Sequence, residues 1–250
     1  MIIDLQNEFL ASTGRYRILD SSKETLFANL TVLVPEFRKN GNIIWVKSIY
    51  DNEDEAGTQP EDSDSESPGG SSSTTFNPND RIAHLAGTHK GKHPCCPVGS
   101  TNAEIYTTAS ALIADSDTVI TKTNYSAFKD TNLLSTLHAH SVKYIYFCGL
   151  LSNVCVLATL IDAVQIDGFR VYAVSDCLGW RREKSHLRAL SRMKDMRVNV
   201  VESQKACSED AGDGVLSIPE LYYVNGSIPS WRVQIALYEK VGPLYKRVYN

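Results

Sequence analysis

The chain has 250 residues, which suits one α/β domain with a large core, or such a domain with an appendage. Hydrophobic residues make up 42% and charged residues 22%, as in ordinary globular proteins, and no apolar run is long enough to predict a membrane span. The formal net charge is only -4, and no basic stripe is interleaved with aromatic residues. These features argue against a protein that binds nucleic acid or a membrane.

Cysteine usage and the first residues indicate a reducing compartment. Six cysteines in a chain of this length do not make a disulfide scaffold, and none forms a CxxC pair with zinc spacing. Met1–Asp4 lacks the basic start, the long apolar run and the cleavage site of a secretory signal. We therefore expect a cytoplasmic location, and the abrupt start at a strand is the pattern of a trimmed N-terminus.

The first fifty residues predict a strand, a helix and a second strand. Ile2–Asp4 is expected to be the end of a short buried strand. Residues 22–39 have helical apolar spacing, begin at a serine cap and stop at Gly41. Pro35 lies inside this stretch and predicts a kink or a break. Residues 42–47 predict a buried strand.

The segment 51–80 differs from its surroundings in composition. Residues 51–66 carry eight acidic residues and no basic residue, and the stretch to residue 80 is rich in Ser, Gly and Pro, with Phe76 as its one aromatic residue. Such a segment buries too little apolar surface to offset the entropy of ordering it. We expect a mobile surface insertion, either a solvated loop without function or a regulatory lid.

Strands and helices alternate between residues 118 and 201. Strands are expected at 118–121, 142–148, 169–175 and 198–201, and helices at 131–140, 153–167 and 182–195. This alternation is typical of βαβ units, whose right-handed crossovers place helices on both faces of a parallel sheet. The expected fold is therefore α/β, with three α/β/α layers around a central, mostly parallel sheet.

The end of the chain leaves this rhythm. Residues 211–250 hold six large aromatic residues: Tyr222, Tyr223, Trp231, Tyr238, Tyr245 and Tyr249. Aromatic side chains at that density favour burial. We expect one domain over 1–207 and an aromatic-rich extension over 208–250, which packs on the domain or on another subunit.

Three reactive side chains follow predicted strand ends, where ligands bind in open α/β sheets. Asp4 and Lys122 each end or follow a strand, and Cys155 falls near the start of a helix. The free N–H groups and partial positive charge of a helix N-terminus favour a thiolate and can hold an oxyanion. The alternative is an ordinary buried thiol, since Cys155 has apolar neighbours.

Asp4 and Lys122 have complementary chemistry. A carboxylate after two isoleucines is expected to be partly buried and to need a partner, and Lys122 can be that partner. Beside a thiol, the carboxylate can accept the thiol proton, while the ammonium lowers the pKa of both neighbours. The alternative is a helix-capping aspartate and an exposed lysine.

Four segments resemble the motifs of the isochorismatase-like cysteine hydrolases. They are Ile3–Phe9 (IDLQNEF), Cys96–Glu104 (CPVGSTNAE), Lys122–Phe128 (KTNYSAF) and Gly149–Val156 (GLLSNVCV). They follow one another in the family's order over about residues 2–205. The chain is therefore similar to a superfamily that includes isochorismatases, nicotinamidases and N-carbamoyl amidohydrolases.

The resemblance implies a catalytic triad and an oxyanion site. Cys155 is the implied nucleophile, Asp4 the general base, and Lys122 the group that orients and polarises. The resemblance also implies a cis peptide between Leu150 and Leu151, which directs the N–H of Leu151, together with that of Cys155, at the oxyanion.

The resemblance also bears on the substrate pocket and on metals. Phe9, Tyr125 and Trp180 are implied to line the pocket, with core packing as the alternative. Nicotinamidases bind a metal through Asp, His and His at positions that are here Tyr50, Asn52 and Cys95, and His84, His89 and His93 nearby have a different spacing. We therefore expect no metal and no other cofactor, and nicotinamide is a disfavoured substrate.

The presence of Cys155 favours cleavage of a C–N bond in a small amide, carbamoyl or imide-like substrate through a thioester-type intermediate. Ureidoacrylate and N-carbamoyl amidohydrolases of the superfamily are the better comparison. Two alternatives stay open: a vinyl ether hydrolase of the isochorismatase type, which needs Asp4 and Lys122 but not Cys155, and a binding protein of the same fold without catalysis. Members of the superfamily are commonly oligomers, so the resemblance implies a homo-oligomer, a dimer or a tetramer.

Overall fold

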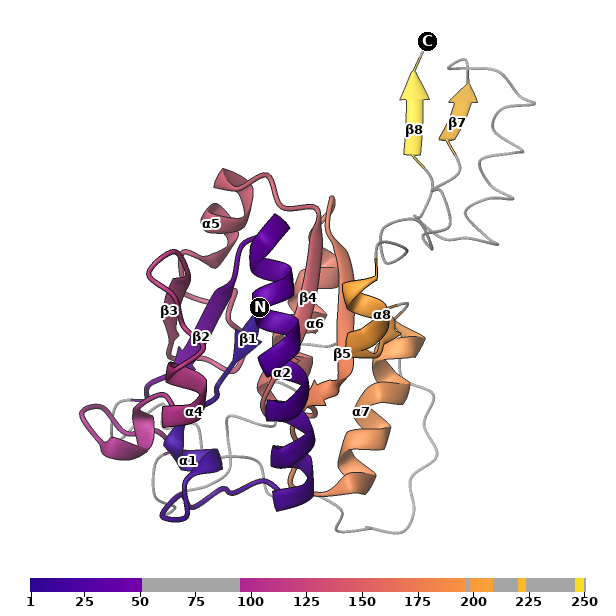
Figure 1. Cartoon of the computed structure of the whole chain (residues 1–250). Helices are drawn as coiled ribbons and strands as arrows, with labels where there is room; N and C mark the ends of the chain where they lie inside the picture. The colour runs from indigo at the N-terminus through magenta and orange to yellow at the C-terminus, as the bar shows by residue number, and fades with distance from the viewer. Residues whose placement is uncertain (51–94, 197, 209–219, 224–245, 250) are drawn as a thin grey trace, which may run out of the picture. The chain divides into compact units, whose positions relative to one another are not determined.

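The computed structural model describes residues 1–50, 95–196, 198–208, 220–223 and 246–249. The chain divides into two compact units, Met1–Cys207 and Ser208–Asn250 (Figure 1). The acidic segment 51–80 lies outside the described residues, and so do Asn52, His84, His89, His93 and most of 209–250. In the part of the chain that is described, no helix is both long enough and apolar enough to cross a membrane.

A six-stranded parallel sheet forms the centre of the first unit (Figure 1). Its strands are β1 (Ile2–Ile3), β2 (Ile44–Ser48), β3 (Thr118–Lys122), β4 (Tyr144–Gly149), β5 (Arg170–Leu178) and β6 (Asn199–Val201). Their order is β3-β2-β1-β4-β5-β6, and every neighbouring pair is parallel, as predicted. The chain winds outward from β1 in one direction and from β4 in the other, so ligands are expected at the carboxyl ends of these two strands.

Helices cover both faces of the sheet. On one face α2 (Asp20–Asn40) and α8 (Ser203–Cys207) contact β5, and on the other α6 (Cys155–Gln165) packs on β4 and β5. Figure 1 shows α2 in front of the sheet and α6 behind it. The predicted three-layer α/β/α fold is confirmed.

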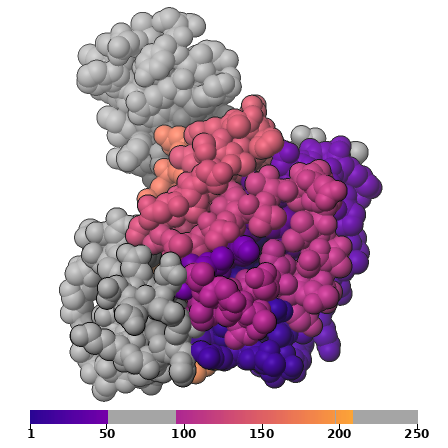
Figure 2. Space-filling view, turned by 90° about the vertical axis from the view of Figure 1, so that its left-hand side faces the viewer, coloured from indigo at the N-terminus to yellow at the C-terminus, as the bar shows by residue number. Residues whose placement is uncertain are grey.

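The other helices are shorter or lie at the edges. They are α1 (Asn7–Leu10), the 3-10 turn η1 (Thr101–Ala103), α4 (Thr107–Ser110), α5 (Leu133–Ala139) and α7 (Glu183–Asp195). Among them α7 contacts β6, and α1 contacts η1. Figure 2 shows the face on the β3 side, where the segment after residue 95 (magenta) lies next to residues 1–50 (indigo).

Helix α2 excludes one of the two outcomes expected at Pro35, the break. Its buried side chains repeat with helical spacing, namely Ser22, Leu26, Leu30, Leu33 and Val34. The helix does not break at Pro35 but continues to Asn40. Proline removes one main-chain hydrogen bond, yet the buried face before it and the contact of Phe37 with Tyr146, whose ring centroids lie 4.8 Å apart, hold both halves on the sheet.

Gly149 lets two segments approach closely at the centre of the sheet. Its φ of 109° lies in the region that favours glycine, and a Cβ at this position would come within 2.1 Å of the Ile3 carbonyl oxygen. The next residue, Leu150, donates its N–H to that same oxygen at 2.8 Å. The loop that leads to Cys155 is therefore held against the end of β1.

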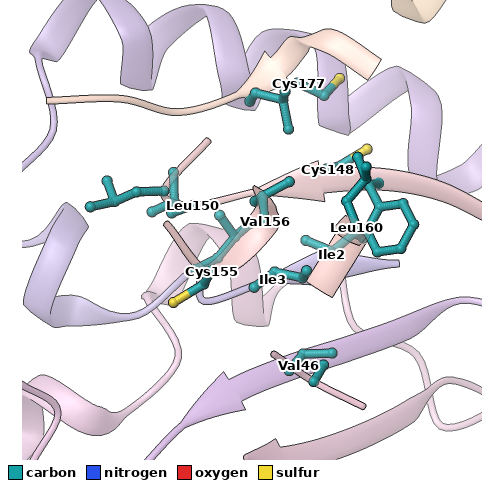
Figure 3. Packing of buried hydrophobic residues seen from close by; sticks show 14 of the residues in the cluster. Ile2, Ile3, Val46, Cys148, Leu150, Cys155, Val156, Leu160 and Cys177 are labelled. Carbon is teal, nitrogen blue, oxygen red and sulfur yellow. The ribbon is translucent and has the colours of Figure 1, made fainter. Parts of the chain in front are cut away.

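The hydrophobic core fills the space between the sheet and α6 (Figure 3). Ile2, Ile3, Val156 and Leu160 are buried there. Most residues of α6 are buried, which accounts for its largely apolar sequence. The helix begins at Cys155 itself, two residues later than the sequence predicts, which makes this cysteine its first residue.

The second unit contains a short parallel pair of strands. They are β7 (Glu220–Tyr223) and β8 (Lys246–Tyr249), and their register pairs Glu220 with Lys246.

Candidate active site

The carboxyl ends of three strands bring a carboxylate, a hydroxyl and an ammonium together. Asp4 follows β1, Ser48 is the last residue of β2, and Lys122 is the last residue of β3. Ser48 and Lys122 are direct partners in the β2–β3 register. The exposed fractions of Asp4, Ser48 and Lys122 are 0%, 1% and 0%.

The backbone of Asp4 turns out of the sheet in an uncommon conformation. Its φ is 55°, which few residues other than glycine adopt, although aspartate tolerates it better than most. The N–H of Asp4 still donates to the Val46 carbonyl at 2.8 Å, and its carbonyl accepts from the Gln6 N–H at 2.8 Å. The main chain of Asp4 is thus held on both sides of its Cα atom, and this fixes the direction in which the side chain leaves the sheet.

Asp4 and Lys122 form a buried ion pair. Oδ2 of Asp4 lies 3.1 Å from Nζ of Lys122. The ammonium also donates to the Ser48 hydroxyl at 2.5 Å and to the Asn124 carbonyl at 3.1 Å. Burial lowers the pKa of Lys122, but the charges of Asp4 and Cys155 raise it by more, so that it lies above its ordinary value. Lys122 is therefore a permanent cation in this site.

Cys155 joins this pair from the start of α6, with an exposed fraction of 1%. Its pKa lies well above the ordinary thiol value, because burial and the Asp4 carboxylate raise it by more than the Lys122 ammonium lowers it. The Lys122 ammonium lowers this pKa, as expected, but burial and the charge of Asp4 outweigh it. Figure 3 shows Cys155 beside Ile3, with its sulfur turned away from Cys148 and Cys177.

The loop 150–154, which leads to Cys155 and is the nucleophile loop of the candidate site, differs from the expectation in one respect. The peptide bond between Leu150 and Leu151 is trans, as are all peptide bonds of the described residues. The prediction of a cis bond at this position is therefore wrong. The trans form is the ordinary one, since a cis bond before a residue other than proline costs about 3–4 kcal/mol. In the described part of the chain, the N–H groups of Leu151 and Cys155 donate to no protein acceptor.

The three predicted pocket residues lie in different surroundings. Tyr125 is buried beside Cys155, and burial together with that thiol raises the pKa of its phenol. Phe9 is fully buried in the hydrophobic core, as the core-packing alternative expects. Trp180 is partly exposed and stacks on His186, with ring centroids 4.0 Å apart and planes at 13°.

Ser48 and Gln6 belong to the site but were missed as functional residues. The Ser48 hydroxyl donates to Oδ1 of Asp4 at 2.9 Å. The Gln6 amide accepts from the Ser48 N–H at 2.9 Å and donates to the Ser48 carbonyl at 2.7 Å. A usable signal existed, since Ser48 directly follows the predicted strand 42–47, and strand ends carry the site.

Tyr50 and Cys95, at two of the positions where nicotinamidases hold a metal, are both buried. Burial raises the pKa of the Tyr50 phenol well above its ordinary value, with the charges of Cys155 and Asp4 as further causes. A neutral phenol is a poor ligand for a divalent metal. Among the described residues, no group of three or more His, Cys, Asp or Glu side chains is placed to hold a metal.

A second buried group supports the nucleophile loop. Nδ1 of His186 lies 3.0 Å from the Ser152 hydroxyl, and the Ser152 N–H donates to the Gly179 carbonyl at 3.0 Å. Burial lowers the pKa of His186 to about 4, so the imidazole is neutral near pH 7. The sequence predicts Trp180 as a pocket residue of this region. It does not predict the contact between His186 and Ser152, because these residues are 34 positions apart and no local pattern connects them.

Two curated relatives match this chain over different lengths. The ureidoacrylate amidohydrolase RutB of Cronobacter sakazakii is 27% identical over 176 residues, which cover 68% of this chain and 70% of that enzyme. RutB of Variovorax paradoxus is 44% identical over 55 residues, and this match spans only 22% of that enzyme's length.

A structural comparison and a family profile agree with these matches. The nicotinamidase PncA of Bacillus subtilis has the same fold, with a TM-score of 0.60 at 21% identity over 80% of this chain and 97% of that one. The profile described as "Isochorismatase domain" matches residues 1–205, which include all the site residues described above. This match over most of the sequence shows that the chain belongs to the isochorismatase family.

Proposed function

We propose that the protein is a cysteine hydrolase that cleaves a C–N bond in a small amide, carbamoyl or imide-like substrate. The observation that carries this proposal is the buried ion pair of Asp4 and Lys122 at the carboxyl ends of β1 and β3, which Cys155 joins from the start of α6. A thiol, a carboxylate and an ammonium in contact provide a nucleophile, a base and a fixed compensating charge.

The first step forms a bond between Sγ of Cys155 and the carbonyl carbon of the substrate. The thiol proton passes to the Asp4 carboxylate, and the carbonyl electron pair moves onto oxygen. The raised pKa of Cys155 makes this base necessary, since the thiol does not ionise by itself near pH 7. The N–H groups of Leu151 and Cys155 are the donors proposed for the oxyanion.

The second step breaks the C–N bond. The oxyanion collapses to a carbonyl, the leaving nitrogen takes the proton from Asp4, and a thioester-type adduct remains on Cys155. A water molecule then attacks the adduct and gives its proton to Asp4. The C–S bond breaks, and the departing sulfur takes that proton back, which restores the thiol and the carboxylate.

Lys122 keeps its charge throughout this cycle. Its raised pKa means that it gives no proton to the substrate, and its ion pair with Asp4 compensates the buried charge of that carboxylate. Tyr125 is buried and its phenol interacts electrostatically with Cys155, which makes it the best-supported pocket residue, while Phe9 and Trp180 stay secondary candidates. No metal ion takes part in the proposed reaction.

The names of the relatives support amide-type substrates. Two of them are called ureidoacrylate amidohydrolases, and a structural neighbour is called a nicotinamidase. Tyr50 and Cys95 stand where the resemblance places metal ligands of nicotinamidases, so ureido acids are the first substrates to test and aromatic amides the second.

The test combines turnover with trapping of the adduct. The wild-type protein is incubated with a panel of ureido acids and primary amides, ammonia release is measured, and the reaction is quenched in acid for mass spectrometry. We expect turnover and an acyl or carbamoyl mass increment on the tryptic peptide 144–170. Fragmentation must place the increment on Cys155, because Cys148 lies in the same peptide.

Cys155→Ala separates this proposal from its alternatives. Loss of turnover with an intact fold supports the nucleophile, while Cys148→Ala serves as the control. Undiminished hydrolysis of a vinyl ether such as isochorismate by Cys155→Ala would replace the proposal with the enol-ether chemistry. A wild-type protein that binds members of the panel but neither turns them over nor forms an adduct would favour a non-catalytic member of the family.

A further inference from the structure

We propose that Ser48 is a positioning residue of this reaction, whose hydroxyl occupies Oδ1 of Asp4 and leaves Oδ2 as the atom that accepts the Cys155 proton. This inference rests on the proposed function, because it assigns a role to one oxygen of the proposed base. Ser48 lies outside the four segments that resemble the motifs of the family.

The two oxygens of Asp4 are not equivalent. Oδ1 accepts a hydrogen bond from the Ser48 hydroxyl at 2.9 Å. Oδ2 has no hydrogen-bond partner among the described residues and lies 3.1 Å from Nζ of Lys122. A buried carboxylate oxygen that accepts no hydrogen bond keeps its lone pairs available for a proton.

Ser48 also connects the carboxylate to the ammonium. Its oxygen accepts from Lys122 at 2.5 Å while its proton goes to Asp4, so a single hydroxyl spans the ion pair. The hydroxyl of Tyr50 donates to the same oxygen at 3.5 Å. The Ser48 hydroxyl therefore has one donor role and two acceptor roles filled, which fixes its rotation and, through it, the plane of the carboxylate.

The backbone of Ser48 is held independently of its hydroxyl. The Gln6 side chain accepts from its N–H at 2.9 Å, donates to its carbonyl at 2.7 Å, and makes a third bond to the Ala103 carbonyl at 2.7 Å. Ser48 also pairs with Lys122 in the sheet register. Removal of the hydroxyl alone thus leaves the strand in place, so a variant tests the hydroxyl and not the fold.

The expected effect of Ser48→Ala is on the chemical step. Without the hydroxyl, Oδ1 loses its donor and the carboxylate is free to rotate, so Oδ2 is no longer set apart as the acceptor of the thiol proton. We expect kcat to fall by about 10- to 100-fold, the size of one lost hydrogen bond to a charged group, with KM within about threefold of wild type.

Three variants make this test specific. Ser48→Thr keeps the hydroxyl and is expected to recover most of kcat, with KM close to that of wild type. Ser48→Cys replaces the hydroxyl with a thiol, which is of similar size but a weak hydrogen-bond donor. Its kcat is expected to resemble that of Ser48→Ala, so it replaces the alanine variant in the experiment should that variant not fold. Ser203→Ala removes another buried hydroxyl, which donates to Asp176 at 2.6 Å, and is expected to keep wild-type kcat.

The outcomes separate this inference from the proposed function. Wild-type kcat in folded Ser48→Ala, alongside an inactive Cys155→Ala, would overturn the role of Ser48 and leave the nucleophile in place. Full activity of Cys155→Ala would instead remove the proposed function itself. A fall of kcat that Ser48→Thr does not reverse would show that the residue acts through packing, and would also overturn the inference.

Discussion

The carboxylate of Asp4 and the ammonium of Lys122 lie 3.1 Å apart, and neither side chain is exposed to solvent. Two charges in such a place stabilise each other only as a pair, because each alone would have to be desolvated without compensation. This mutual dependence explains why two residues 118 positions apart are fixed at one end of the sheet, and it leads directly to a prediction on stability.

Removal of either member of this pair destabilises the fold more than removal of both. We expect Asp4→Asn and Lys122→Met each to lower the free energy of unfolding by about 3–5 kcal/mol, since each leaves a buried charge unpaired. The double variant is expected to regain a large part of this loss. Urea unfolding of the four proteins measures the coupling.

The exposed ion pair of Lys39 and Glu36 is the matched control. Their ammonium and carboxylate lie 2.6 Å apart, with side chains 64% and 42% exposed. Lys39→Met is expected to change the free energy of unfolding by about 1 kcal/mol or less. Additive effects of Asp4→Asn and Lys122→Met in the double variant would contradict the buried pair.

Alkylation of Cys155 is expected to respond in opposite directions to the two substitutions. The Asp4 carboxylate raises the pKa of the thiol, and the Lys122 ammonium lowers it. Asp4→Asn therefore increases the thiolate fraction and speeds alkylation by iodoacetamide near pH 7, although it abolishes turnover, whereas Lys122→Met slows alkylation. Rates are followed on peptide 144–170, and Cys207, which is partly exposed, reports the unchanged background. Equal alkylation rates in both variants would show that the three groups do not interact.

Gly149→Ala and Gly168→Ala separate close packing from backbone conformation. Both glycines have a positive φ, 109° and 97°, but a Cβ on Gly168 meets open space while one on Gly149 meets the Ile3 backbone. We expect Gly168→Ala to cost about 1–2 kcal/mol of unfolding free energy, and Gly149→Ala to cost considerably more or to prevent folding. Thermal unfolding measures both, and similar losses would show that β1 and the nucleophile loop are less tightly joined.

His186 makes the stability of the fold depend on pH. Its pKa is lowered to about 4 in the folded state from an ordinary value of 6.5, so its contribution is complete above pH 6.5 and is lost as the pH falls toward 4. The loss amounts to at most about 1.4 kcal/mol per pH unit in that window. In His186→Gln the melting temperature is expected to fall less steeply between pH 6.5 and 4 than in wild type.

His140 supplies the control for this experiment. It is exposed at the end of α5, and His140→Gln is expected to reproduce the wild-type dependence of melting temperature on pH. A slope in His186→Gln that equals the wild-type slope would exclude the buried imidazole as its cause.

Some expectations from the sequence still lack a structural test. A homo-oligomer and a cytoplasmic location remain predictions, and so does the mobile character of the insertion 51–80, which falls outside the described residues. The expected cis peptide at Leu150–Leu151 and the break at Pro35 are corrected by the structure. Both depend on how neighbouring segments pack, which local sequence does not contain.

The sequence by itself determined the layers of the fold. Alternating strand and helix patterns predict a parallel sheet, and the rule that strand ends carry ligands selects Asp4, Lys122 and Cys155 among many polar residues. The prediction of the layers succeeds because hydrophobic periodicity is a local property, whereas the catalytic roles of the three residues stay a proposal.

The tertiary structure alone decided how these groups act on one another. The register that sets Ser48 against Lys122, 74 residues later, makes one hydroxyl the bridge between base and ammonium. The same packing buries Cys155 beside a carboxylate and raises the pKa of its thiol, although a helix start and a lysine predict the opposite. Charge interactions and desolvation depend on distances of a few ångströms between residues far apart in the chain, and only the folded structure sets those distances.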